Sequence, residues 1–299
     1  MANIPISLSI PDEMLIPGPQ GPQGDQGIQG PQGPPGSSAA NGPNILDYAG
    51  ATTGNAQDAL NAALADCISG GYRKITVPVG WFDMSAAPNP ITHGVRLVGE
   101  NPSQSVLRKT YNGDGLVFNG SGGMGGGVSN MAIYAGTGTT SGSALKLVAS
   151  STESPDYCWH ENVVITGAGS WQYGLLVDGI ARSSPAGLRD THFKNLNIFA
   201  CTSAPAYLRK AIGAVFNGLG CFPAGGANGN LYVADGSDSV MIHGGNINGE
   251  MNLVNCSRVV FSGAIGSLNT AASAVKCHIS GTCSGAIYNN MTNSRVDFP

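Results

Sequence analysis

The chain has 299 residues, of which 45 are glycine and only 11% are charged. A formal net charge of −4 without a basic cluster argues against nucleic-acid binding, and no run of eighteen apolar residues is present for membrane insertion. This composition excludes a protein of long charged helices and predicts many turns. The N-terminus lacks the basic segment of a signal peptide, so we expect synthesis and assembly in the cytoplasm.

Cysteine and histidine are scattered along the chain without the spacing of a metal site. None of the seven cysteines forms a Cys-x-x-Cys motif, and the five histidines are equally dispersed. Cysteines in such a pattern usually act as small buried hydrophobic residues. We therefore predict structural thiols, no bound metal and no cofactor.

Residues 1–17 alternate apolar side chains with small or polar ones and are interrupted by proline. Ile4, Ile6, Leu8 and Ile10 lie at every second position, which is typical of a short strand. A single strand has no core of its own and needs a partner surface. We interpret the segment as a peg that docks on a larger assembly. A frayed terminus is the alternative.

Residues 18–36 carry glycine at every third position, and proline and glutamine fill most positions between. In collagen, three polyproline-like strands wind around an axis where only glycine fits. The pattern predicts a homotrimer, with two identical chains as partners and a rod roughly 50–60 Å long. A disordered linker is the alternative, but a linker does not require a period of three. The predicted axial glycines are Gly18, Gly21, Gly24, Gly27, Gly30, Gly33 and Gly36.

The remainder of the chain divides into a hinge, a cap and a series of rungs. Residues 37–43 are mostly small and form the predicted hinge before a domain at 44–299. Residues 44–94 contain one helical segment and the first strands, and we interpret them as the cap. Residues 95–299 show no further helical pattern.

The helical segment covers residues 55–67, where apolar side chains recur at helical spacing. Asn55 suits the start of this helix, and the Gly70-Gly71 pair suits its end. Strands are expected next, over 74–78 and from Val95 onward.

The last third of the chain repeats an apolar-x-apolar frame at a nearly constant interval. Ile242, Phe261, Ile279 and Phe298 follow one another at a step of about 19 residues. A unit of about twenty residues cannot bury its own apolar face, and stacking of successive units solves this. The repeat therefore predicts a parallel β-helix, because an antiparallel sandwich requires a hairpin every 8–12 residues or so.

The same frame occurs earlier in the chain at longer intervals. Met131, Val163 and Leu196 follow one another at a step of about 32 residues. We interpret these longer steps as turns of the same coil that carry loops outward. Successive rungs should lie about 4.8 Å apart.

These features make residues 44–299 resemble the pectate-lyase-like β-helix domain of bacteriophage tailspikes and tail fibres. The resemblance rests on Gly50-Ala-Thr-Thr-Gly-Asn-Ala-Gln-Asp58, on Gly70-Gly71, and on Ile75-Thr-Val-Pro78 followed by Gly80-Trp-Phe82. In that family, these segments close the bottom of the coil with a helix.

The sequence departs from the family in the acidic turn, where Asn55 and Gln57 stand in a stretch usually rich in aspartate. The resemblance implies an all-β fold: a right-handed parallel β-helix capped by one short helix, preceded by a collagen-like triple helix, in a homotrimer. It also implies a place in the virion tail after assembly in the host cytoplasm. Residues 1–17 would dock on a tail or adaptor protein, and the coil would contact a host cell-surface glycan.

Members of this family often cleave polysaccharide with two carboxylates held roughly 5–10 Å apart. The chain contains no Asp-Asp or Asp-x-Asp sequence. Asp235 and Asp238 share a Gly-Ser turn, with Glu250 expected in the same rung, and these three are the catalytic candidates. A solvated turn has the same Asp-Gly-Ser-Asp sequence, and a dyad shared between neighbouring chains is a further alternative.

Aromatic residues gather between positions 157 and 173, which include two of the three tryptophans. Aromatic rings stack on the CH faces of sugars, while carboxylate and imidazole groups bind sugar hydroxyls. Packing in the core or between chains is the alternative, because tryptophan and tyrosine are common there too. The candidate glycan-binding residues are Tyr157, Trp159, His160, Glu161, Trp171 and Tyr173.

Three functions fit the sequence. The first is a trimeric tail fibre or tailspike that attaches the virion to a host surface polysaccharide. The second is a polysaccharide depolymerase, either a glycoside hydrolase or a lyase, on the same β-helix. The third is a purely structural virion protein. The sparse acidic residues favour attachment over cleavage.

Overall fold

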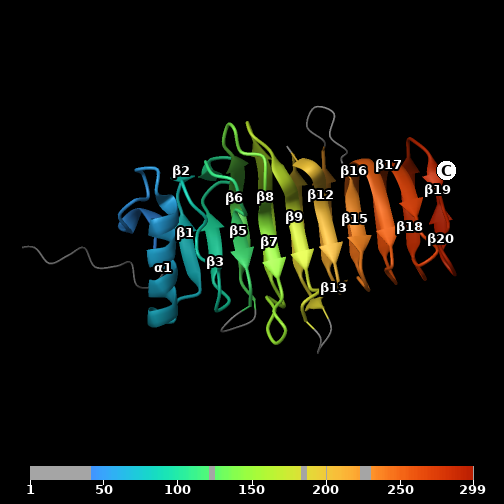
Figure 1. The fold of residues 1–299 in the computed structure, drawn as a ribbon, viewed down its shortest axis with the longest axis horizontal. Helices are drawn as coiled ribbons and strands as arrows, with labels where there is room; N and C mark the ends of the chain where they lie inside the picture. Colours follow the sequence, from blue (N-terminus) through green and yellow to red (C-terminus); the bar gives the residue numbers. More distant parts are fainter. Residues whose placement is uncertain (1–41, 121–124, 183–186, 200, 223–229, 299) are drawn as a thin grey trace, which may run out of the picture. The chain divides into compact units, whose positions relative to one another are not determined.

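The computed structural model describes residues 42–298 apart from 121–124, 183–186, 200 and 223–229. Every pair of strands among these residues is parallel, and successive turns of the chain stack in sequence order, as Figure 1 shows. The predicted parallel β-helix is confirmed, and the alternative of an antiparallel sandwich is wrong. The predicted peg at 1–17, rod at 18–36 and most of the hinge at 37–43 lie outside the described residues.

The coil begins with a short 3-10 helix, η2 (Ile45–Asp47), and one α-helix, α1 (Ala56–Gly70). Helix α1 buries Ala56, Leu60 and Leu64 on the side that packs against the first strands. It ends at Gly71, which adopts the left-handed conformation, with φ of 71°, that favours glycine at this position. The predicted cap helix is confirmed and extends three residues beyond its predicted end. No helix of the described part is long and apolar enough to span a membrane.

Each rung contributes to three strand faces, which we name A, B and C. Face A carries the first strand of each rung, and the longer strands then bend into face B. The strands that form face A are β1 (Lys74–Val77), β3 (Arg96–Gly99), β6 (Gly127–Ala135), β8 (Trp159–Gly167), β11 (His192–Ile198), β14 (Val215–Cys221), β16 (Met241–Val254), β17 (Val260–Thr270), β18 (His278–Cys283) and β20 (Arg295–Asp297).

Face B starts with two strands of its own and continues in the later parts of β6, β8, β11, β14, β16, β17 and β18. Its two separate strands are β2 (Gly80–Met84) and β4 (Ser105–Lys109). Face C completes each rung, and the ends of β16 and β17 also belong to it. Its own strands are β5 (Leu116–Phe118), β7 (Ser143–Val148), β9 (Trp171–Asp178), β12 (Cys201–Arg209), β15 (Leu231–Ala234) and β19 (Ile287–Tyr288).

A short fourth ladder closes the corner between faces C and A. It begins with β10 (Leu188–Arg189) paired to β13 (Ala211–Ile212). Single bridges extend it from Ile212 through Asp238 and Ser257 to the last rungs. This ladder fixes the turn that contains Asp238.

The interior of the coil consists of side chains stacked rung upon rung. On face A, the rings of His160, Phe193 and Phe216 stack with centroids 4.9 and 4.5 Å apart. Ile242 and Phe261 continue this row in register, and all five side chains are at most 1% exposed. Each fully buried large apolar side chain contributes roughly 1.5–3 kcal/mol to stability. The long row explains why a chain with few charges folds as one continuous coil.

The register confirms most of the predicted repeat and corrects its last step. Ile242, Phe261 and Ile279 occupy the same inward position of face A, as predicted. The next residue in that row is Val296, not Phe298, because the final rung is two residues shorter than the predicted step. The earlier series through Met131, Val163 and Leu196 is confirmed in register, but it lies after the corner into face B rather than at the face A position.

Asparagine forms a ladder at the corner between faces A and B. Asn130, Asn162 and Asn195 each have φ of 53°, in the left-handed region that asparagine tolerates better than most residues. The side-chain amides of Asn162 and Asn195 each donate to the amide oxygen of the asparagine one rung earlier, with N···O distances of 2.9 Å at both steps. Gly218 and Gly244 take the same corner position in the next two rungs. The corner is therefore held by stacked amides and then by glycine.

All seven cysteines are free thiols, and six of them are buried. Cys221, for example, extends the inward row of face B between Ile198 and Ile247. The prediction of small buried structural residues is therefore confirmed for these six.

Candidate functional site

The predicted glycan-binding segment is divided between the outside and the inside of the coil. Tyr157 is 55% exposed, and Trp159 is 41% exposed on the outer side of face A. The ring of Trp159 stacks on His192 of the next rung, with centroids 5.2 Å apart. Glu161 also points outward and pairs with Lys194 at 2.6 Å. These residues form an outer aromatic and charged patch.

His160 does not belong to this patch, so its predicted contact with glycan is wrong. Its side chain is 1% exposed and lies in the inward row of face A. Its Nδ1 accepts a hydrogen bond of 3.2 Å from the backbone N–H of Val128. Burial and the charge of Arg96 lower its pKa to about 3, so the imidazole is neutral. Its role is packing.

Trp171 is likewise fully buried, and its predicted contact with glycan is also wrong. Its indole N–H donates to the carbonyl oxygen of Thr166 at 3.1 Å. The ammonium group of Lys109 lies 3.9 Å from the ring centroid, a cation–π contact inside the protein. Burial lowers the pKa of Lys109 to about 8.

Tyr173, the remaining candidate, lies on the outer side of face C beside two tyrosines that sequence reasoning missed. The ring centroids of Tyr173 and Tyr207 are 5.7 Å apart, and those of Tyr207 and Tyr232 are 5.5 Å apart. Ser203 and Ala204 complete a groove of about 230 Å³, which we name the tyrosine groove. Three tyrosines from three consecutive rungs thus line one outer hollow.

Charged groups border the tyrosine groove at one end. Arg209 lies 3.5 Å from Asp178 and 3.2 Å from Asp235, so it bridges two carboxylates. Asp235 also accepts a hydrogen bond of 3.4 Å from the hydroxyl of Tyr207. Burial and the carboxylate of Asp235 raise the pKa of Tyr207, so its hydroxyl remains protonated. The guanidinium lies over the Tyr207 ring at 5.8 Å. A sugar would meet aromatic faces, hydroxyls and held charges here.

The three catalytic candidates do not converge on one point. Asp235 borders the tyrosine groove, whereas Glu250 lies at the other end of face C. Glu250 aligns with Asn230, five residues before Asp235, which is about 16 Å of extended strand. Asp238 pairs with Arg258 and accepts from the hydroxyl of Ser257 in the corner ladder. The predicted trio in one rung is therefore wrong.

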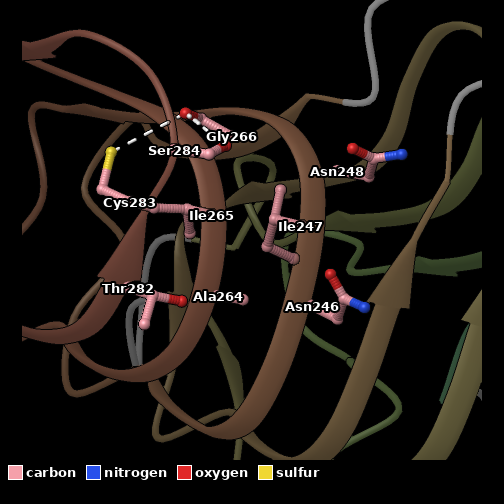
Figure 2. Close-up of a pocket in the computed structure, with 9 residues that line it drawn as sticks. All are labelled: Asn246, Ile247, Asn248, Ala264, Ile265, Gly266, Thr282, Cys283 and Ser284. Atoms are coloured by element: carbon pink, nitrogen blue, oxygen red, sulfur yellow. Dashed lines mark hydrogen bonds between the residues drawn. The ribbon is translucent and has the colours of Figure 1, made fainter.

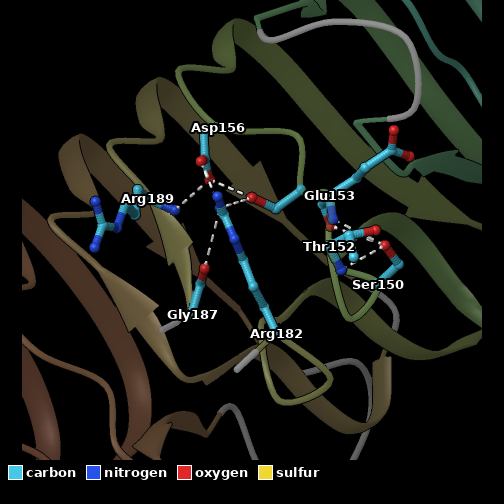
Figure 3. A network of polar contacts seen from close by, with 8 residues as sticks. Ser150, Thr152, Glu153, Asp156, Arg182, Gly187 and Arg189 are labelled. Atoms are coloured by element: carbon cyan, nitrogen blue, oxygen red, sulfur yellow. Dashed lines mark hydrogen bonds and ion pairs between the residues drawn. The ribbon is translucent and has the colours of Figure 1, made fainter. Parts of the chain in front are cut away.

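Asp156 is enclosed in a network that joins two loops of the coil (Figure 3). Its carboxylate contacts the guanidinium of Arg182 at 2.5 Å and accepts from the backbone N–H of Arg189 at 2.8 Å. Arg182 also donates to the carbonyl oxygen of Gly187 at 3.4 Å. The side chains of Asp156 and Arg182 are 6% and 10% exposed, so this buried pair holds the loops and faces no ligand.

Two of the three catalytic candidates, Asp235 and Asp238, are thus ion-paired. The carboxylates of Asp156, Glu161 and Asp178 are also ion-paired. A general acid in glycoside hydrolysis needs a raised pKa, which a neighbouring cation opposes. The hydrogen bond from Lys194 instead lowers the pKa of Glu161. Within the described ranges, no group of three or more His, Cys, Asp or Glu side chains is placed to hold a metal ion. The arrangement on the outer faces is suited to binding.

No protein-family profile matches the chain, and no curated protein sequence is similar to it. Among solved structures, it is similar to an Acinetobacter phage tailspike protein, with 11% identity and a TM-score of 0.40 over 87% of this chain and 59% of that chain. The ORF18 protein of Geobacillus virus E2 gives 11% identity and a TM-score of 0.39 over 85% and 60%. An α-1,3-glucanase catalytic unit from Streptomyces thermodiastaticus gives 10% identity and a TM-score of 0.33 over 91% of this chain and 72% of that chain.

The chain spans about 60% of the length of the two phage proteins. Identity of 11% or less and TM-scores of 0.40 or less assign no function by themselves. Function therefore rests on the residues of this chain.

Proposed function

We propose that this chain is the attachment protein of a bacteriophage tail, and that its β-helix binds a polysaccharide of the host surface. The tyrosine groove carries the proposal. It presents Tyr173, Tyr207 and Tyr232 outward, with Arg209 and Asp235 at its border. Stacking on the rings together with hydrogen bonds to held polar groups is the chemistry that recognises a sugar chain.

The sequence outside the described residues supports a trimeric form of this protein. Unbroken glycine triplets from Gly18 to Gly36 require two further strands around one axis. The apolar alternation within 1–17 suits docking on a tail or adaptor protein. In this arrangement, the rod separates the docking segment from the coil, and the finished protein resides in the virion tail.

A depolymerase is the second candidate function, and one observation favours it. Asp178 and Asp235 both lie within 3.5 Å of Arg209, beside the tyrosines, so two carboxylates do occur at the groove. Glycoside hydrolysis uses two carboxylates roughly 5–10 Å apart. Both carboxylates, however, are engaged in ion pairs with the same arginine. We therefore place binding before cleavage and leave a purely structural role as the third possibility.

The deciding experiment measures binding of the purified full-length protein to polysaccharide extracted from the host. Tyr207→Ala and Tyr232→Ala should each weaken affinity about tenfold, because each removes a ring that a sugar stacks on. Tyr288→Ala is the matched control, since Tyr288 lies in the same outward row at the far end of face C. Equal affinity for all three variants and the parent protein would refute glycan binding in the tyrosine groove.

A parallel assay for reducing ends or unsaturated sugars separates attachment from cleavage. Release of such ends that Asp235→Asn or Asp178→Asn abolishes would establish the depolymerase. Release that Asp238→Asn or Glu250→Gln abolishes would establish cleavage at another place. Absence of both binding and release would favour the structural role.

A further inference from the structure

A second hollow lies on the outer side of face B in the last three full rungs (Figure 2). Two outward rows border it. Asn246, Ala264 and Thr282 are in register in the first row. The second row lies two residues further along each strand. Its members are Asn248, Gly266 and Ser284.

The hollow exists because two of its positions carry almost no side chain. Ala264 and Gly266 form its floor between the larger residues of the rungs on either side, and the volume is about 190 Å³. A Cβ atom at Gly266 would lie 2.6 Å from the carbonyl oxygen of Gly249, so only glycine fits there. The strand register shifts between Ile247 and Glu250, which brings Gly249 close. We name this hollow the amide groove.

The lining of the amide groove is polar but uncharged. Asn246 and Asn248 are exposed, and each offers one carbonyl acceptor and one NH₂ donor group. Thr282 and Ser284 add hydroxyl groups on the opposite side. None of its nine lining residues has a carboxylate, ammonium, guanidinium or imidazole group, and the thiol of Cys283 donates to the carbonyl oxygen of Gly266 at 3.7 Å. Such a surface offers no ion pair to a charged ligand.

An aromatic platform continues the second row on the rungs below the amide groove. Phe199 and Phe222 stack with centroids 4.8 Å apart, and Phe199 is 37% exposed. The backbone N–H of Phe222 donates to Ile198, which places Phe222 one rung before Asn248. Phe222 and Asn248 are therefore about 5 Å apart along the coil. A chain of sugar rings lying along the coil would meet a stacking surface and then amides.

A peptide strand is a poorer occupant of this surface. Strand addition needs a free sheet edge, whereas the strands of face B at β16 and β17 pair with rungs on both sides. Among the described strands, the face B part of β18 pairs with β17 alone, but the hollow lies over the side of the sheet and not along that edge. A ligand on the flat side of a sheet is recognised by outward side chains. Amide and hydroxyl groups match a saccharide that carries both hydroxyls and acetamido groups. The acetamido N–H and C=O pair with an asparagine amide, and its methyl group suits the small floor at Ala264.

We propose that the amide groove binds an uncharged N-acetylated saccharide, as a site separate from the tyrosine groove. The inference rests on the proposed glycan-binding function but uses different residues on a different face. Loss of one groove should therefore leave the other intact, so the two proposals fail separately.

The test uses the full-length protein and three trisaccharide probes. The first is N-acetylglucosamine trimer, and the second is the same trimer without its acetyl groups, which is cationic. The third is galacturonic acid trimer, a different sugar chain that is anionic. Calorimetry should show binding of the acetylated probe, at least tenfold weaker binding of both charged probes, and about tenfold loss in Asn248→Ala and Ala264→Leu. Asn217→Ala and Ala272→Leu are matched controls, since both residues lie outside the groove, on face A and in a turn. Tyr207→Ala should bind the acetylated probe as the parent does.

A crystal structure with the acetylated probe keeps the test independent of whether variants fold. Density for the sugar between Asn248 and Ser284 supports the proposal. Density only at the tyrosine groove, equal affinity for all three probes, or no binding of the acetylated probe at millimolar concentration overturns it. Preferential capture of an extended peptide by the same residues would also overturn it.

Discussion

The ammonium nitrogen of Lys109 lies 3.9 Å from the ring centroid of Trp171, and both side chains are fully enclosed by the coil. The ammonium group also donates to the carbonyl oxygens of Gly113, at 2.9 Å, and of Ser141. A lysine held in this way ties the end of β4 to the loops before β5 and β7. Its charge is satisfied by the indole face and by backbone oxygens, without a direct carboxylate contact.

The contribution of Lys109 to stability should therefore rise with pH in the alkaline range. Burial lowers the pKa of Lys109 to about 8, so between pH 8 and 10.5 the unfolded chain binds more protons than the folded protein. The free energy of unfolding should increase by about 3 kcal/mol over that range through this group. Urea unfolding of the parent protein and of Lys109→Met measures it, because only the parent has the contribution. Parallel pH profiles would contradict the prediction.

His160 should lower the stability of the folded protein at acidic pH. Its pKa of about 3 in the folded protein lies far below the ordinary value of 6.5, so the unfolded chain takes up a proton first as pH falls. The free energy of unfolding should fall by up to about 1.4 kcal/mol for each pH unit below 6.5. His160→Phe should lack this slope, although it should cost about 1–3 kcal/mol at pH 7 by leaving the Val128 N–H without its acceptor. An imidazole that titrates near pH 6 by NMR would refute this account.

The asparagine ladder predicts a difference between two substitutions at Asn162. Asn162→Ala should cost about 3 kcal/mol, because it removes two amide hydrogen bonds and places alanine at a φ of 53°. Asn162→Gly removes the same hydrogen bonds but tolerates the backbone, so its cost should be about 1 kcal/mol smaller. Denaturant midpoints of the two variants measure the difference. Equal losses of stability in the two variants would mean that the left-handed backbone conformation at Asn162 does not limit which residue is tolerated there.

Arg209 should control the electrostatics at the border of the tyrosine groove. Arg209→Gln removes the cation paired with both Asp178 and Asp235, and the cost should be about 1 kcal/mol because these side chains are partly exposed. Added salt should reduce that cost by screening the two carboxylates. Arg258→Gln is the control, since among the described residues Arg258 forms an ion pair with one carboxylate, that of Asp238, rather than with two. If the stability difference between Arg209→Gln and the parent protein did not change with salt concentration, the two ion pairs of Arg209 would be contradicted.

The glycine triplets predict a mass of about 91 kDa in solution, three times the 30.3 kDa chain. Gly27→Ser places a side chain at the crowded axis and should lower the temperature at which the trimer dissociates. Gln26→Ala changes a neighbouring position that faces outward in such a helix and should have little effect. Light scattering on a sizing column measures the mass of the parent protein, and light scattering during heating measures the dissociation temperature of both variants. A monomeric parent protein would refute the homotrimer.

Periodicity predicted the coil because stacking of like residues is what the fold requires. The steps that separate Met131, Val163 and Leu196 correspond to complete rungs, and the register follows them. Periodicity could not predict which residues face outward near a corner. Asn162 takes a left-handed conformation and shifts the alternation of β8, so His160 and Val163 both point inward although they are three residues apart. The outward assignment of His160 failed for this reason.

The tyrosine groove could not be predicted from the sequence for a related reason. Tyr173, Tyr207 and Tyr232 meet because loops of different lengths separate consecutive rungs. The two intervals between them in the sequence are unequal, so they match no constant step. The register of β12 and β15 aligns Tyr207 with Tyr232, whereas Tyr173 is aligned with Ala204 and contacts Tyr207 through its ring. A site formed between rungs is therefore invisible to motif analysis of a single sequence.

The inward row of face A has a consequence for how such a protein can diverge. Phe193, Phe216, Ile242 and Phe261 keep their register although the rungs between them differ in length. Segments exchanged at the corners would thus alter the outer surface of the coil while leaving the inward rows untouched. Loop grafts of this kind would change binding specificity, in evolution and in the laboratory alike, without a new fold.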